Sequence, residues 1–164
     1  MNYFELFEIP VQLKVDKALL PKKYFELSRK YHPDFFANAG KQDKAMALEI
    51  SALLNKAFKT FQNPDETIKY VLQLKELLEE EEKYELPPDF LMEVLELNEQ
   101  LMDKGSNNGI ETRIDQLQTE IYEPVQKIIE GYQEGVTSEK ELLQVKEYYY
   151  KKKYIDRIRK ELSV

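Results

Sequence analysis

The chain has 164 residues, of which 42% are hydrophobic and 34% charged, and its formal net charge is −7. This composition is typical of a globular protein with one ordinary domain or two small ones, and the negative charge disfavours nonspecific attraction to nucleic acid phosphates. Because the chain contains no cysteine and a single histidine, the sequence excludes disulfides, thiolate metal sites and cysteine nucleophiles.

The first half of the chain predicts short helices and a helical hairpin, because its apolar residues recur with a helical period. A short apolar helix over residues 1–9 ends at Pro10, and Asp16 is a candidate N-cap for a second helix. A loop is expected over residues 32–40, and a long return helix from Lys41. The apolar stripe of the second helix consists of Leu20, Tyr24, Leu27 and Tyr31.

The sequence changes character after the long return helix. Asn63 and Pro64 predict a helix end followed by a new helix, with Asn63 as its cap and Pro64 at its first position. The acidic run 79–82 is expected to be a solvated helix end or linker, because like charges repel. We therefore place a domain boundary in residues 76–87.

The remaining residues predict three longer helices that can bury one core. The first runs from about Asp89 to Lys104 and ends at the turn Gly105–Gly109. The second carries an apolar stripe that includes Ile128, and Pro124 should bend it. The third is expected to begin at a capping box formed by Ser138 and Glu141. The predicted fold class is therefore all-α, with a C-terminal three-helix bundle.

The tripeptide His32-Pro33-Asp34 lies between the second helix and the return helix. Such a tripeptide alone could be an incidental turn, but this one joins two amphipathic helices. Pro33 restricts the backbone, and the Asp34 carboxylate can accept a bidentate arginine from a partner. The second helix also has a basic face that could meet an acidic surface, formed by Lys23, Arg29 and Lys30. Lys22 could be either a contact or a solvated lysine.

These features together resemble a J-domain over residues 1–75, in which His-Pro-Asp joins two antiparallel helices. The resemblance implies a partner, a DnaK-type chaperone ATPase, that is contacted by His32, Pro33, Asp34 and the basic face. One departure is Phe35-Phe36, where many J-domains have a lysine. Either one phenylalanine packs under the loop, or both are exposed and the partner contact differs.

The helix after Pro88 is apolar on more than one side. Its core stripe is expected to contain Phe90, Val94, Leu97 and Leu101. A second set of apolar residues, Leu91, Leu95 and Met102, lies beside it, together with Met92, Glu96 and Glu99. This pattern indicates either a wide core face or an exposed apolar patch rimmed by carboxylates, which would mark a protein-binding surface.

The segments MNYFELFEIP, YHPDFFA and PDFLMEVLELNE resemble the HscB-type iron–sulfur co-chaperone family over nearly the full chain. The resemblance implies that the domain of residues 88–164 binds an IscU-type cluster scaffold while the J-domain stimulates the chaperone. It also implies scaffold contacts at Leu91, Met92, Leu95, Glu96 and Glu99, with Asp103 in place of a longer acid. An aromatic residue of the last helix belongs to this surface in the family; we assign Tyr150, although Tyr148 and Tyr149 leave the register open.

We therefore expect a cytoplasmic co-chaperone that is not an enzyme and needs no cofactor or metal. The alternative is a J-domain co-chaperone with a different client protein. A His32–Asp34 acid–base site and a purely structural helical protein are the other hypotheses. Neither nucleic acid nor a membrane is expected as a partner.

Overall fold

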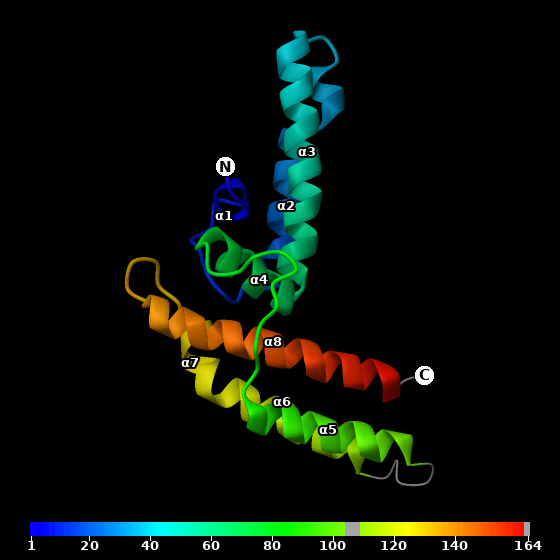
Figure 1. Cartoon of the computed structure of the whole chain (residues 1–164). Coiled ribbons are helices and arrows are strands. Elements are labelled where there is room, and N and C mark those ends of the chain that lie inside the picture. Colours follow the sequence, from blue (N-terminus) through cyan, green and yellow to red (C-terminus); the bar gives the residue numbers. More distant parts are fainter. Residues whose placement is uncertain (104–108, 163–164) are drawn as a thin grey trace. The chain divides into compact units, whose positions relative to one another are not determined.

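A computed structural model describes residues 1–103 and 109–162, and within these ranges the chain is helical with no strand (Figure 1). The predicted turn at Gly105–Asn108 and the helix end at Lys104 lie outside the described residues. The chain divides into two compact units, Met1–Val71 and Leu72–Val164. None of the helices formed by the described residues is long and apolar enough to cross a membrane.

The first unit contains a hairpin of two helices and three shorter elements. Its elements are α1 (Tyr3–Leu6), α2 (Leu20–Lys30), the 3₁₀ helix η1 (Pro33–Phe36), α3 (Lys41–Gln62) and α4 (Pro64–Leu74), whose last residues fall in the second unit. α2 and α3 pack against each other, and η1 packs on α3. The expected loop over residues 32–40 thus contains one turn of 3₁₀ helix.

Phe61 organises the core of the first unit. Its side chain is 1% exposed, and its ring centroid lies 4.9 Å from that of Phe4 and 5.3 Å from that of Phe7. Tyr3 stacks on Tyr70 with ring centroids 4.3 Å apart, and its backbone N–H donates to the Tyr70 hydroxyl. The short N-terminal helix is therefore fastened to α3 and α4 by aromatic contacts, which fixes the base of the hairpin.

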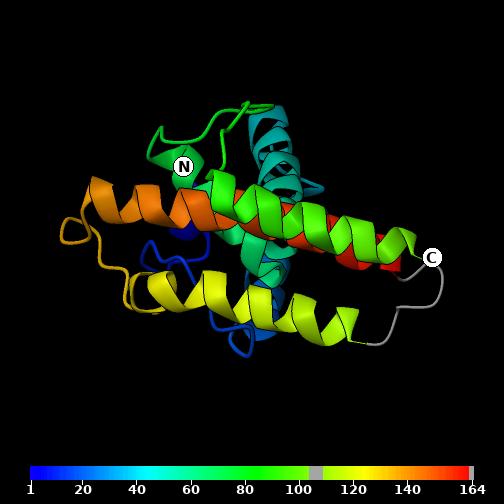
Figure 2. The same ribbon diagram turned by 60° about the horizontal axis from the view of Figure 1, so that its bottom comes forward.

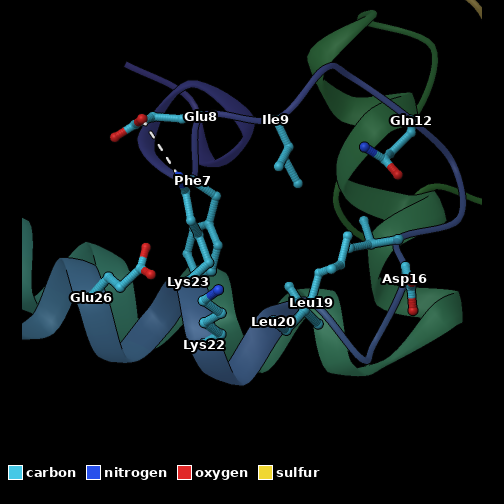
Figure 3. A pocket seen from close by; sticks show the side chains of 11 residues that line it. Phe7, Glu8, Ile9, Gln12, Asp16, Leu19, Leu20, Lys22, Lys23 and Glu26 are labelled. Carbon is cyan, nitrogen blue, oxygen red and sulfur yellow. Dashed lines mark ion pairs between the residues drawn. The ribbon is translucent and has the colours of Figure 1, made fainter.

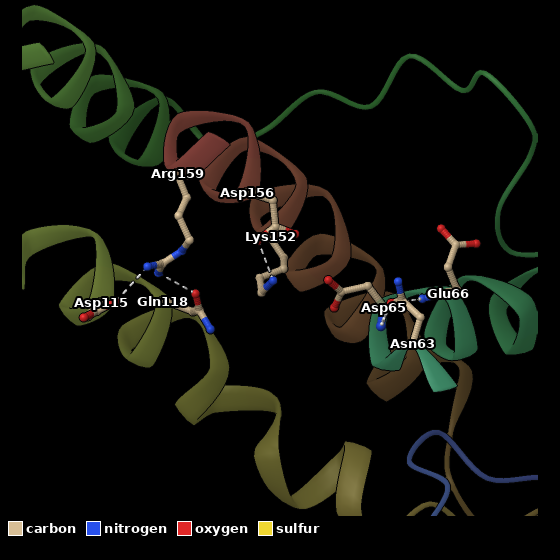
Figure 4. A network of polar contacts seen from close by, with 8 residues as sticks. All are labelled: Asn63, Asp65, Glu66, Asp115, Gln118, Lys152, Asp156 and Arg159. Atoms are coloured by element: carbon tan, nitrogen blue, oxygen red, sulfur yellow. Dashed lines mark hydrogen bonds and ion pairs between the residues drawn. The ribbon is translucent and has the colours of Figure 1, made fainter. Parts of the chain in front are cut away.

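The two predicted caps in this unit have different outcomes. Asn63 caps α4 as expected, because its Oδ1 accepts the backbone N–H groups of Asp65 at 3.0 Å and Glu66 at 3.2 Å (Figure 4). The prediction for Asp16 was wrong. Its Oδ1 accepts the N–H of Ala18 in a local turn, and α2 begins only at Leu20. Asp16 therefore closes a turn that precedes the helix.

The second unit contains the three expected long helices, which pack on one another (Figure 2). Its elements after α4 are α5 (Pro88–Met102), α6 (Ile110–Tyr122), the 3₁₀ helix η2 (Glu123–Val125), α7 (Gln126–Glu130) and α8 (Glu139–Leu162). Gly109 has a φ of 95°, a left-handed conformation that glycine adopts easily, and it directly precedes α6.

The predicted bend and the predicted capping box are both present. Pro124 lies in η2, which separates α6 from α7. Ile129 is buried at 4% exposure, whereas Ile128, the expected core residue, is only half-buried, so the core position of α7 differs by one residue from the expectation. At the start of α8, the Glu141 carboxylate accepts the Ser138 N–H at 3.0 Å, and the Ser138 hydroxyl accepts the Glu141 N–H at 3.1 Å.

Residues 78–86 form a segment outside the helices, with a turn at residues 80–81, that contacts α8 and is here called the strap. Glu82 pairs with Lys146 at 2.8 Å, and the Tyr84 ring stacks on the Tyr150 ring with centroids 4.6 Å apart. Leu78 and Leu86 at its ends are buried. The expectation of a solvated acidic run therefore fails at Glu82, whose side chain is 21% exposed, because Lys146 provides a neutralising partner.

Candidate functional site

The tip of the α2–α3 hairpin presents His32-Pro33-Asp34 on the surface. The His32 Nδ1 accepts the backbone N–H of Asp34 at 3.2 Å and lies 3.5 Å from the Asp34 Oδ2. The Asp34 side chain is 90% exposed, and the His32 side chain is 53% exposed. His32 therefore caps η1, while the Asp34 carboxylate remains open to a cationic group from another protein.

The arrangement at the tip favours binding over catalysis. The His32 Nδ1 is occupied by the backbone of its own turn, and an exposed His–Asp pair gains little from its charges. Among the described residues, no group of three or more His, Asp or Glu side chains is placed to hold a metal ion. The tip thus offers a stiff, polar recognition element.

The three predicted basic residues of α2 have different surroundings. Lys23 is paired with Glu8 at 3.5 Å, at the edge of an apolar hollow of about 310 Å³ between α2 and the segment that precedes it (Figure 3). Arg29 and Lys30 are exposed, and neither forms an ion pair with another described residue. These two side chains are consequently the available cations of the basic face.

An exposed aromatic residue on α2 was missed by the sequence analysis. Phe25 is 61% exposed, and the Arg29 guanidinium lies over its ring at 5.7 Å. Phe35 at the tip is 71% exposed, whereas Phe36 is half-buried, so one of the two phenylalanines is available to a partner. Phe25, Arg29, Lys30 and Phe35 line a common hollow on the first unit. The sequence could have indicated that Phe25 is exposed, because this residue lies outside the apolar stripe of α2.

The apolar patch on α5 is exposed. Leu91, Met92 and Leu95 are 41%, 62% and 58% exposed, while Phe90, Val94 and Leu97 face the core at 6% exposure or less. The exposed acidic residues Glu96 and Glu99 lie on the same helix, and the exposed Asp103 directly follows its last residue. The interpretation as a wide core face is therefore wrong for these three apolar residues. The second unit has an apolar strip beside carboxylates.

Tyr150 lies under the strap. It is 9% exposed, and Tyr148 and Tyr149 are no more exposed. Burial, followed by the charge of Glu82 and a hydrogen bond to it, raises the pKa of Tyr150 to about 12. The contact between Tyr150 and a scaffold stays a prediction. Tyr154, which the sequence analysis did not select, is half-buried and meets the Phe90 ring at 6.5 Å.

Known proteins resemble this chain in sequence and in fold. Residues 86–163 match a family model described as the HSCB C-terminal oligomerisation domain. A "Co-chaperone protein HscB homolog" of Photobacterium profundum is 31% identical, covering 99% of this chain and 95% of the relative, and one of Shewanella halifaxensis is 35% identical with the same coverage.

Two solved structures resemble the whole chain. The chaperone HscB of Vibrio cholerae has a TM-score of 0.74 at 27% identity, covering 99% of this chain and 96% of that chain. The human co-chaperone protein HscB has a TM-score of 0.78 at 28% identity, covering 99% of this chain and 81% of that chain. The predicted fold class, an N-terminal J-type domain followed by a C-terminal helical bundle, is thereby confirmed.

Proposed function

This chain belongs to the HscB co-chaperone family, and we propose that it assists iron–sulfur cluster assembly by linking a DnaK-type chaperone ATPase to an IscU-type scaffold. The tip of the first unit recruits and stimulates the ATPase, and the second unit holds the scaffold. The chain itself catalyses no reaction. The observation that carries the proposal is that both recognition surfaces are exposed in a chain whose relatives are named co-chaperones.

The chaperone contact is supported by the chemistry of the tip. Asp34 offers its carboxylate to a cation, while Arg29 and Lys30 offer cations to an acidic surface. Phe25 and Phe35 add apolar area between these charges. Because η1 is short and capped by His32, few conformations have to be frozen when the partner binds.

The scaffold contact is supported by the α5 patch. Leu91, Met92 and Leu95 gain from burial against a partner, and the neighbouring carboxylates Glu96 and Glu99 can orient it through charge. With both partners bound to one chain, the second encounter becomes intramolecular, so the effective concentration of scaffold near the ATPase rises.

An ATPase assay tests the chaperone half of the proposal. We expect the parent chain to stimulate a DnaK-type chaperone and the His32→Gln variant to lose nearly all stimulation while retaining its helical circular dichroism. Gln62→Ala, an exposed substitution at the opposite end of α3 from η1, is the matched control and should stimulate like the parent. Equal stimulation by parent and His32→Gln would contradict the J-domain assignment.

A binding titration against a purified IscU-type scaffold tests the other half. We expect saturable one-to-one binding by the full chain. If the chain stimulates the ATPase but does not bind the scaffold, the alternative holds, namely a J-domain co-chaperone with a different client protein.

A further inference from the structure

The C-terminal part of α8 is basic within an acidic protein. The whole chain has 24 Lys and Arg against 31 Asp and Glu, whereas residues 146–160 contain seven basic residues and two acidic ones. A local excess of one charge sign on a single helix creates a field that opposes the net charge of the molecule. This segment therefore differs in electrostatic character from the rest of the chain.

Four of these seven basic side chains are paired with carboxylates. Lys146 contacts Glu82 at 2.8 Å, and Lys151 contacts Glu147 at 3.4 Å. Figure 4 shows two further pairs: Lys152 reaches Asp156 at 2.6 Å, and Arg159 extends from α8 to Asp115 and Gln118 of α6. The charge of each of these four cations is balanced by a carboxylate of the second unit. We therefore regard them as part of the fold and not of a binding surface.

The other three, Lys153, Arg157 and Lys160, form what we call the basic stripe. All three are exposed, and none forms an ion pair with any residue in the described parts of the chain. Their spacing of four and three residues places them on one face of α8, over a length of about 10 Å. The stripe thus presents a row of uncompensated cations.

Aromatic rings hold two of these cations in place. The Lys153 ammonium lies 5.6 Å from the Tyr149 ring centroid and 5.7 Å from that of Tyr150, and the Arg157 guanidinium lies 5.2 Å from the Tyr154 ring centroid. Such contacts restrict the rotamers of long side chains, which lowers the entropic cost of using them in binding. The two cations are therefore preorganised.

The stripe adjoins the helix that carries the apolar patch. Arg157 covers Tyr154, and Tyr154 in turn contacts Phe90, the core residue that directly precedes Leu91 on α5. α5 and α8 also pack along each other. An acidic rim with Glu96 and Glu99 on α5 and a basic stripe on α8 consequently belong to neighbouring helices of one unit.

We propose that the basic stripe binds an acidic segment of the same partner protein that docks on the α5 patch. This inference rests on the proposed function, in which that partner is the IscU-type scaffold. The partner then needs cations opposite Glu96 and Glu99, carboxylates opposite Lys153, Arg157 and Lys160, and apolar side chains for Leu91 and Leu95. Opposite charges on two neighbouring helices permit one orientation of the partner and repel the reversed one.

A protein segment fits the stripe better than RNA or an anionic membrane does. Three cations over about 10 Å match a few carboxylates, whereas a polyanion extends further and meets the repulsion of a chain with net charge −7. The position next to an apolar patch also favours a folded partner, because protein interfaces combine an apolar centre with a charged rim.

Charge reversal tests this proposal in the full-length chain. The variant Lys153→Glu/Arg157→Glu is compared with Lys127→Glu/Lys140→Glu, which makes the same change in net charge at two exposed lysines of α7 and α8. Binding of the IscU-type scaffold is titrated at about 0.05 M and about 0.3 M salt, and circular dichroism verifies that each variant is folded.

We expect the stripe variant to bind the scaffold on the order of tenfold more weakly at low salt, with a smaller difference at high salt, and the control to stay within about twofold of the parent. Parent-like binding by the stripe variant would overturn the proposal and leave the proposed function intact. Absence of scaffold binding by the parent would overturn both. Stripe-dependent binding to RNA or anionic vesicles, with unchanged scaffold binding, would refute the choice of a protein segment.

Discussion

Removing the two leucines of the α5 patch should weaken scaffold binding without weakening the fold. Leu91 and Leu95 are 41% and 58% exposed, so together they offer about as much free surface as one fully exposed leucine. Burying one such side chain contributes about 1.5–3 kcal/mol. Since alanine retains the β-carbon, we expect Leu91→Ala/Leu95→Ala to lose about 1–2.5 kcal/mol of binding free energy, or about five- to seventyfold in Kd.

The assay is a calorimetric titration of the IscU-type scaffold with the full-length chain, parallel to thermal unfolding followed by circular dichroism. Leu48→Ala on α3 is the matched control, because Leu48 is 59% exposed and lies in the first unit. The control should bind like the parent, and the unfolding free energies of all three proteins should agree within about 0.5 kcal/mol. A loss below about twofold in a folded double variant would refute the assignment of the patch.

Three further predictions concern stability. Phe61→Ala should cost about 3–5 kcal/mol of unfolding free energy in urea titrations, because it leaves a cavity among Phe4, Phe7 and Tyr3; a cost below about 1 kcal/mol would contradict its central place in the core. Ser138→Ala should cost about 1 kcal/mol in the same assay, because the Glu141 N–H loses its acceptor, whereas Ser138→Asp should retain the cap. The third change is Glu82→Gln: burial raises the pKa of Glu82, but the hydrogen bond and charge of Lys146 outweigh burial and hold the pKa below its ordinary value of 4.5. Its stabilisation is therefore present above pH 4.5 and lost as the pH falls through the folded-state pKa, so parent and variant should differ at neutral pH, and this difference should shrink as the pH is lowered below 4.5. A difference that does not change with pH would contradict this linkage.

The sequence predicted the ends and breaks of helices well where these depend only on neighbouring residues. The caps at Asn63 and Ser138 and the break at Pro124 each depend on a few adjacent residues, and each is present. Asp16 carried the same kind of signal, but its carboxylate satisfies the N–H of Ala18 in a turn four residues before α2. A capping residue therefore indicates a nearby helix start without fixing its position.

Features that depend on distant residues could not be predicted. The strap contact joins Glu82 to Lys146 and Tyr84 to Tyr150, and no local pattern connects these positions. The burial of Ile129 in place of Ile128 depends on how α7 packs against α8, which periodicity alone does not fix, because both positions follow Val125 at a helical spacing. The α5 patch remained ambiguous for a similar reason, because amphipathicity alone does not tell how many neighbours cover a helix.

The strap also determines where the C-terminal unit can be cut for separate expression. A fragment that began at Pro88 would lack Glu82 and Tyr84, which would leave the Lys146 ammonium without its carboxylate and uncover the Tyr150 ring. Newly bared aromatic surface beside a row of lysines would promote self-association and could imitate partner binding in a capture experiment. Fragments of this unit should therefore begin no later than residue 76, so that the leucines at both ends of the strap remain in place.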